Sequence, residues 1–213
     1  MTDRAENTNR EEPLELLLSY RLTAAVDYAR TLHIERRKGT RIPYMAHLLG
    51  VAALVMGEAG QPGCSVTEDM ILAALLHDAA EDHGGLLRLQ DIEHNFGPEV
   101  ARMVEGLSDS LASDSDHKQS WLERKQAYIA KLRNEPADTR LISVADKLYN
   151  ARAILDDYRQ IGPAVWQRFK RGRNDQLAYF DQLLAVYRSF PAIRIVDEFE
   201  RVLNQLREIS ANE

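Results

Sequence analysis

The sequence is poor in cysteine, in basic charge and in long apolar runs, and each shortage excludes a class of protein. Its single cysteine, Cys64, excludes an intramolecular disulfide and a cysteine-rich zinc cluster, and suits a reducing compartment. No apolar run reaches the ~18 residues that indicate a membrane span, and the polar N-terminus lacks the apolar core of a signal peptide. A net charge of -6 argues against a general nucleic-acid-binding surface. We therefore expect a cytoplasmic protein without nucleic-acid or membrane partners.

What is present is a globular composition with helical patterning along almost the whole chain. The 213 residues are 45% hydrophobic and 28% charged, which is enough to build a sizeable core. Apolar residues recur at helical spacing, and no run alternates convincingly as a strand would. The sequence predicts an all-α fold, a single helical bundle with additional C-terminal helices.

Proline, glycine and capping residues divide this pattern into segments. We expect a disordered leader over 1–12, the main domain over 13–160, and C-terminal helices over 161–213 packed on the same domain. Ser65 and Glu68 have the spacing of a capping box at the start of one helix. The helices are expected at about 14–32, 44–56, 67–82, 89–95, 98–107, 120–133, 138–158, 164–170, 174–188 and 192–209.

Aromatic residues are frequent in the C-terminal segment. They could face the core, cap a pocket or form the interface of a homodimer. We favour the core, because aromatic residues at helical spacing usually point inward. The residues concerned are Trp166, Phe169, Tyr179, Phe180 and Tyr187.

The most informative stretch is LLHDAAED, over residues 75–82, in which an apolar helix abruptly presents one imidazole and three carboxylates. On a continuous helix, His77 lies above Glu81 and Asp78 above Asp82. His77 and Asp78 could hold a divalent cation, with the later carboxylates near a water on that cation, as a metal-dependent hydrolase requires. The alternative is a helix-terminal polar pair followed by a solvated acidic turn.

Two further polar residues interrupt apolar helices. His47 lies among apolar residues and could be either a core histidine or a metal ligand. Asp146 lies in a helix that is otherwise apolar on that side, and burying an unpaired carboxylate costs several kcal/mol. It therefore needs a metal or a salt bridge, for which Lys147 and Arg152 are the candidates. Asn150, one turn further, projects from the same face as Asp146.

The ordered set of His47, His77-Asp78 and Asp146 resembles the H…HD…D signature of the HD-domain metal-dependent phosphohydrolases. Neighbouring motifs narrow the resemblance to the hydrolase domain of the RelA/SpoT alarmone enzymes, particularly the small alarmone hydrolases that include the metazoan SpoT homologue. It covers roughly residues 20–160, so that 13–160 would be an HD domain. The motifs are RRKGTRIPYMAH, LLHDAAED, FGPEVARMVEGLSD and ADKLYNAR.

The resemblance implies a role for each matching residue. Glu81 and Asp82 would orient and deprotonate the attacking water. The metal would be Mn²⁺ as is usual in the family, although a His/carboxylate set also suits Fe²⁺ or Zn²⁺. The implied metal ligands are His47, His77, Asp78 and Asp146. The implied substrate contacts are Asn150, Arg37, Lys38, Arg124 and Lys125, of which the four basic residues could instead be solvated.

Departures from the family pattern leave the substrate open. The chain has Ala46 and Leu48 around His47 where Asn-His-Pro is common, and Ala79-Ala80 where Thr-Val is common. The loop over 108–118 and the stretch over 166–171 also differ. These changes spare the implied metal ligands, so the site chemistry is expected to be intact.

The implied activity is hydrolysis of the alarmone guanosine 3′,5′-bis(diphosphate), ppGpp, to GDP and pyrophosphate, as in the stringent response. The protein would be a hydrolase without a companion synthetase domain. Alternatives within the same chemistry are an adenosine alarmone, the 2′-phosphate of a nicotinamide cofactor, or a nucleoside monophosphate. A catalytically silent nucleotide-binding module is a further alternative, against which the intact pair of Glu81 and Asp82 argues.

Overall fold

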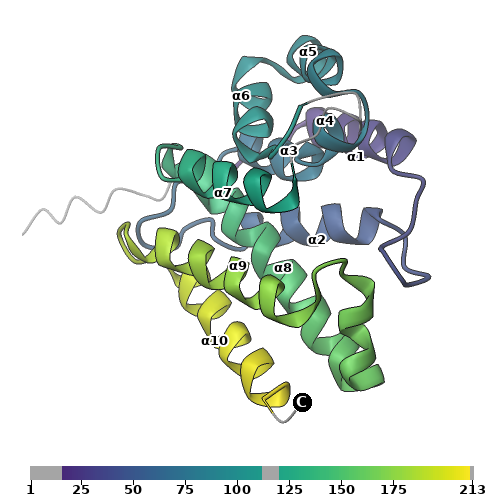
Figure 1. The fold of residues 1–213 in the computed structure, drawn as a ribbon. Coiled ribbons are helices and arrows are strands. Elements are labelled where there is room, and N and C mark those ends of the chain that lie inside the picture. Colours follow the sequence, from purple (N-terminus) through teal and green to yellow (C-terminus); the bar gives the residue numbers. More distant parts are fainter. Residues whose placement is uncertain (1–15, 112–119, 212–213) are drawn as a thin grey trace, which may run out of the picture.

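The computed structural model describes residues 16–111 and 120–211, and this part of the chain is helical almost throughout (Figure 1). It contains no strand within these ranges, only an isolated β-bridge between Arg36 and Pro43. The predicted all-α fold is confirmed, whereas the predicted leader over 1–12 lies outside the described residues. The elements are α1 (Tyr20–Leu32), α2 (Met45–Met56), α3 (Glu68–Leu76), α4 (Ala79–Asp82), α5 (Gly85–Phe96), α6 (Pro98–Leu107), α7 (Trp121–Leu132), α8 (Ala137–Ile161), the 3₁₀ helix η2 (Gly162–Arg168), α9 (Gly172–Arg188) and α10 (Arg194–Ile209).

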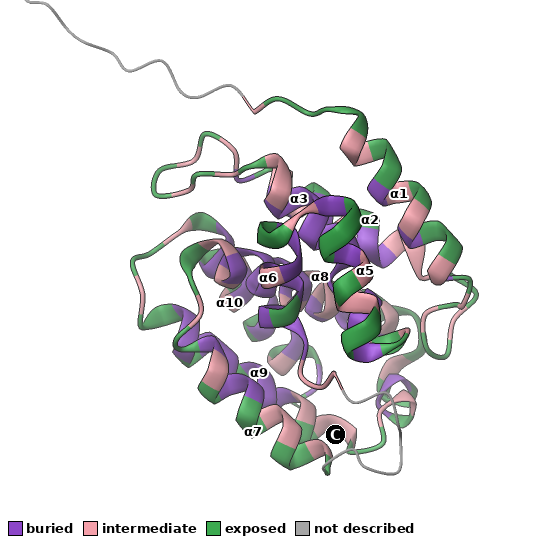
Figure 2. Ribbon diagram, turned by 90° about the horizontal axis from the view of Figure 1, so that it is seen from above, coloured by how far each residue is buried: buried purple, intermediate pink, exposed green. Residues whose placement is uncertain are grey.

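The long helix α8 organises the fold, because α2, α3, α6, α9 and α10 all contact it. Figure 2 shows the buried residues gathered where α2, α3 and α6 surround α8. The contact between α2 and α8 is especially close at Gly50, where an added Cβ would lie 2.0 Å from Tyr149 Cε2. A residue without a side chain is needed there, and this close approach brings His47 of α2 next to Asp146 of α8.

The predicted continuous helix over 67–82 is wrong in one respect that matters for function. Helix α3 ends at Leu76, and α4 begins only at Ala79. The Nδ1 atom of His77 lies 2.8 Å from the carbonyl oxygen of Ala74, the acceptor that a continuous helix would offer to the N–H of Asp78. The break therefore places His77 and Asp78 at a helix junction.

The helix boundaries differ from prediction where local hydrogen bonds decide them. Thr67, rather than Ser65, caps α3, with Oγ1 accepting the N–H of Met70 at 3.3 Å. Helix α1 begins at Tyr20 after an N-cap at Ser19, and α5 begins at Gly85. Among the described helices, none combines the length and the apolarity that a bilayer crossing requires.

The C-terminal helices complete the core, because α9 and α10 both contact α8. The predicted inward orientation of their aromatic residues is confirmed for four residues, whereas Phe169 is partly buried. The expected helix over 164–170 is instead the 3₁₀ helix η2, which follows α8 directly through Gly162 at φ 60°. The four buried aromatic residues are Trp166, Tyr179, Phe180 and Tyr187.

Candidate active site

Four polar side chains from separate parts of the chain converge between α2, the α3–α4 junction and α8. His47 Nε2 lies 3.2 Å from His77 Nε2 and 3.4 Å from Asp78 Oδ2. Asp146 Oδ1 lies 3.4 Å from His47 Nε2 and 3.8 Å from His77 Nε2. Ligands around a tetrahedral ion with bonds of ~2.0–2.2 Å are about 3.3 Å apart. His47, His77 and Asp78 therefore have the spacing of ligands around one cation, and Asp146 lies beside both histidines.

Hydrogen bonding also leaves the lone pair of one histidine, His77, pointing inward. Because His77 Nδ1 donates to the Ala74 carbonyl, its Nε2 is left unprotonated in the neutral ring and faces the other donors. His47 and His77 are both buried, with 2% and 4% of their surfaces exposed. Two imidazoles and two carboxylates form a borderline donor set, which fits a divalent metal ion.

The charged groups of the cluster shift one another's pKa values when no metal is bound. Burial alone lowers the pKa of His77, but the negative charges of Asp78 and Asp146 outweigh it and raise the pKa to about 9. Burial would raise the pKa of Asp78, yet the charge of His77 holds it well below the usual range. Positive charge at the centre of the cluster is thus favoured by its surroundings.

Asp146 has a second set of partners on its own helix. Its Oδ2 forms an ion pair with Lys147, and its Oδ1 accepts a hydrogen bond of 2.6 Å from Asn150 Nδ2. The predicted shared face of Asp146 and Asn150 is confirmed. The salt bridge to Lys147 exists beside the contacts to the histidines, whereas Arg152 pairs with Glu198.

Sequence reasoning missed two residues that position this cluster. The hydroxyl of Tyr44, just before α2, donates to Asp78 Oδ2 at 2.6 Å. Asp109, after α6, donates its backbone N–H to Glu81 Oε2 at 3.0 Å. Both stand in motifs that carry the family resemblance, Tyr44 in RRKGTRIPYMAH and Asp109 at the end of FGPEVARMVEGLSD, and could have been suspected on that ground.

Glu81 and Asp82 have different surroundings. Glu81 lines the same cavity as the four cluster residues, whereas the Asp82 side chain is exposed on α4. Burial, and then the carboxylate of Asp109, raise the pKa of Glu81 to about 8. Despite its own burial, Asp109 stays ionised, because the hydrogen bond to Glu81 and the charges of Lys125 and Arg124 lower its pKa. Glu81 can therefore exchange a proton near neutral pH.

Three adjoining cavities open beside the cluster, with volumes of about 120, 180 and 280 Å³. Ligand pockets usually have ~300–1,000 Å³, so a nucleotide would need more than one of them. Asn150 lines all three, and Arg37 lines the outer two. The shared walls make them lobes of one cleft.

The structure places four of the five predicted substrate contacts on this cleft. Lys38 lines the lobe near Arg37, and Lys125 lines the lobes near Glu81 and Tyr179. Arg124 is absent from these walls; its Nη1 instead lies 2.7 Å from Asp109 Oδ1 and 3.9 Å from Glu81 Oε1. The C-terminal segment adds Arg168 and Gln176, which the sequence did not suggest, and Phe169 and Tyr179, for which capping a pocket was one of the open alternatives.

The raised pKa of Glu81 predicts how the stability of the metal-free protein depends on pH. The folded state keeps a proton on Glu81 up to about pH 8, whereas the unfolded chain releases it above ~4.3. The resulting stabilisation is present below that lower pH and is lost as pH rises through 8. Glu81→Gln should remove this loss, which is on the order of a few kcal/mol.

Urea unfolding of the chelator-treated proteins at about pH 5.5 and 8.5 measures the effect. Contributions from other groups, including His77, are common to both proteins and cancel in the comparison. An equal loss of stability in the wild type and in Glu81→Gln would contradict the protonated state assigned to Glu81.

Comparison with known proteins identifies similar chains. The HD domain family matches residues 25–176. Human guanosine-3′,5′-bis(diphosphate) 3′-pyrophosphohydrolase MESH1 is 34% identical over 154 residues, covering 70% of this chain and 75% of the human protein. The Drosophila melanogaster MESH1 is 29% identical over 155 residues, covering 72% of this chain and 78% of the fly protein.

Solved structures show the same likeness. A metazoan orthologue of SpoT, described as hydrolysing ppGpp and acting in starvation responses, has a TM-score of 0.71 at 26% identity, covering 90% of this chain and 98% of its own. The lmo0812 protein of Listeria monocytogenes has a TM-score of 0.62 at 28% identity, and the match covers 76% of this chain and 99% of the Listeria chain.

Proposed function

The chain belongs to the HD domain family of metal-dependent phosphohydrolases, and from this premise we propose that it hydrolyses ppGpp to GDP and pyrophosphate. The observation that carries the proposal is the convergence of His47, His77 and Asp78 on one point, with Asp146 against both histidines and a cleft lined by cationic side chains alongside. The similar proteins from human and fly are named for this reaction.

The four converging residues, His47, His77, Asp78 and Asp146, are proposed as the metal ligands. Mn²⁺ is the ion we propose, since the donor set is borderline and accepts it. When bound, such an ion supplies a Lewis acid that activates water and polarises a phosphoryl oxygen. Tyr44 would hold Asp78 in place through its hydrogen bond.

The reaction adds water to the phosphorus at the 3′ position and breaks its bond to the 3′ oxygen, which must gain a proton. We assign the movement of that proton to Glu81, because it lines the cavity and because burial and Asp109 raise its pKa to about 8 when no metal is bound. The backbone N–H of Asp109 fixes the orientation of the Glu81 carboxyl group. Asp82, on the next position of α4, is proposed to assist in orienting the water.

Cations along the cleft would offset the phosphate charges that the acidic cluster repels. Arg37 reaches Asn150 Oδ1 at 3.3 Å and lies over the Tyr149 ring at 5.1 Å. Lys38 and Lys125 are proposed to contact phosphate as well. Arg124 would act indirectly, by holding the Asp109 side chain in place rather than by contacting phosphate.

The direct test incubates Mn²⁺-reconstituted protein with ppGpp and identifies the products, with Asp78→Ala protein as control. GDP and pyrophosphate from the wild type alone would support the proposal. Orthophosphate from a nicotinamide cofactor or a nucleoside monophosphate, without turnover of ppGpp, would overturn the substrate assignment and retain the phosphohydrolase chemistry.

Arg37→Ala is expected to weaken substrate binding more than the chemical step. Loss of a charge-assisted contact of about 1.5–3 kcal/mol corresponds to a rise in KM of roughly 10- to 100-fold, with a smaller fall in kcat. Steady-state kinetics measure both parameters. The matched control is Arg41→Ala, an exposed arginine in the same turn, which should keep the wild-type KM. A similar KM in Arg37→Ala would contradict this role.

A further inference from the structure

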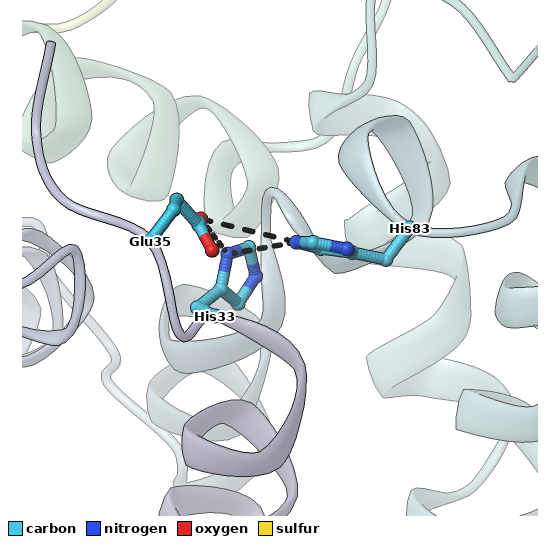
Figure 3. A group of neighbouring side chains, drawn as sticks. All are labelled: His33, Glu35 and His83. Atoms are coloured by element: carbon cyan, nitrogen blue, oxygen red, sulfur yellow. Dashed lines mark hydrogen bonds and ion pairs between the residues drawn. The ribbon is translucent and has the colours of Figure 1, made fainter.

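A second group of metal-ligating side chains lies outside the cluster described above. Figure 3 shows the side chains of His33, Glu35 and His83 pointing toward one another. His33 follows the last residue of α1, Glu35 lies two residues beyond it, and His83 follows the last residue of α4. None of the three was assigned a role by the sequence motifs, and none is part of the proposed hydrolytic mechanism.

The three donor atoms have the spacing of metal ligands. His33 Nδ1 lies 2.8 Å from Glu35 Oε1 and 3.3 Å from His83 Nε2. The distance between Glu35 Oε1 and His83 Nε2 is 3.8 Å. These values lie around the separation of about 3.3 Å between ligands of a tetrahedral ion. The separations in the His47 cluster fall in the same range, from 3.1 to 3.8 Å.

A cation satisfies these atoms better than a proton does. Nδ1 of His33 can carry one proton, yet it faces both the carboxylate of Glu35 and the ring nitrogen of His83. One ion at the meeting point would accept lone pairs from all three. Burial lowers the pKa of His33, which favours the neutral ring that a metal ligand needs.

The backbone around the group also favours positive charge. The N–H of His33 bonds to the Ala29 carbonyl at 2.9 Å and closes the C-terminal end of α1, a helix of 13 residues. The exposed carbonyls at such an end carry partial negative charge and attract cations. His83 closes α4 in the same way, through the Ala79 carbonyl at 3.0 Å.

We propose that His33, Glu35 and His83 form a second metal site, which binds a divalent transition ion such as Zn²⁺ independently of the His47 cluster. Two imidazoles and one carboxylate are a ligand set found with zinc, and the fourth position is left to solvent. Glu35 and His83 are partly exposed, at 40% and 29% of their side chains, so that the ion can enter from the surface.

Metal in this site would tie together two segments that border the cleft. Glu35 begins the turn that carries Arg37 and Lys38, and His83 directly follows Asp82. The His33 ring also stacks on Tyr44, with centroids 5.1 Å apart and planes at 17°, and Tyr44 bonds to Asp78. The second ion is thus a positioning element for the turn, and its binding does not depend on the proposed substrate.

Metal stoichiometry tests the proposal. The full chain is stripped with a chelator, dialysed against Zn²⁺, and its bound metal is counted by mass spectrometry. We expect two ions per wild-type chain and one in either His83→Ala or Asp78→Ala. The matched control is His94→Ala, an exposed histidine on α5, which should keep two. Glu35→Gln serves as a second variant should His83→Ala not fold, as judged by circular dichroism.

Each outcome of this count is decisive. One ion in the wild type and none in Asp78→Ala would overturn the second site while the His47 cluster stands. Two ions in folded His83→Ala or Glu35→Gln would also overturn it. One ion in Asp78→Ala that disappears in Asp78→Ala/His83→Ala would establish it, whatever the activity on ppGpp. With Co²⁺ in place of Zn²⁺, that ion should also give the visible absorption of a tetrahedral site.

Discussion

Replacing Asp78 by alanine is expected to abolish hydrolysis and to remove the metal from the His47 cluster. Asp78 Oδ2 lies 3.1 Å from His77 Nε2 and 3.4 Å from His47 Nε2, so its charge is central to the proposed ligand set. Removing a residue that hydrogen-bonds to a metal ligand typically lowers metal affinity or activity by 10- to 100-fold. Loss of a direct ligand should therefore cost more than about 100-fold.

The experiment measures bound Mn²⁺ and the rate of ppGpp hydrolysis in the same preparations. Asp27→Ala is the matched control, because Asp27 is an exposed carboxylate paired only with Arg30 in the described part of the chain. It should retain both metal and turnover. An Asp78→Ala protein that kept wild-type activity would remove Asp78 from the site.

Much of the fold and of the candidate site could be predicted because the signals were local. Apolar residues at helical spacing, with proline and glycine between them, gave most helices of the described chain. Each of His47, His77-Asp78 and Asp146 interrupts an apolar helix that the core must bury, and it was the resemblance of their order to the HD-domain signature that implied a cluster. Their convergence in space agrees with that prediction.

The remaining features depend on contacts that a single segment does not reveal. The break between α3 and α4 arises because a side chain, that of His77, takes the carbonyl of Ala74. The raised pKa of Glu81 depends on its burial and then on Asp109, 28 positions away, just after the end of another helix. Helical spacing predicted that Tyr179 faces inward, but it could not tell that its ring would reach the cleft.

The same contacts separate the proposed roles of Glu81 and Asp82. Glu81→Gln is expected to lower kcat by roughly 10²- to 10⁴-fold, the usual contribution of a positioned acid or base, while the metal stays bound. Glutamine keeps the size of the side chain and can still accept the N–H of Asp109, but it cannot carry a proton to the leaving oxygen. Steady-state rates with parallel metal analysis measure this effect.

Asp82→Asn is the informative comparison, because it removes the neighbouring charge from the same short helix. The Asp82 side chain is exposed and Glu81 lines the cavity, so the loss in kcat should be smaller for Asp82→Asn than for Glu81→Gln. The reverse order would assign the proton transfer to Asp82. Near-wild-type kcat in both variants would exclude this pair as the acid and base, because removal of a working general acid or base must slow the chemical step.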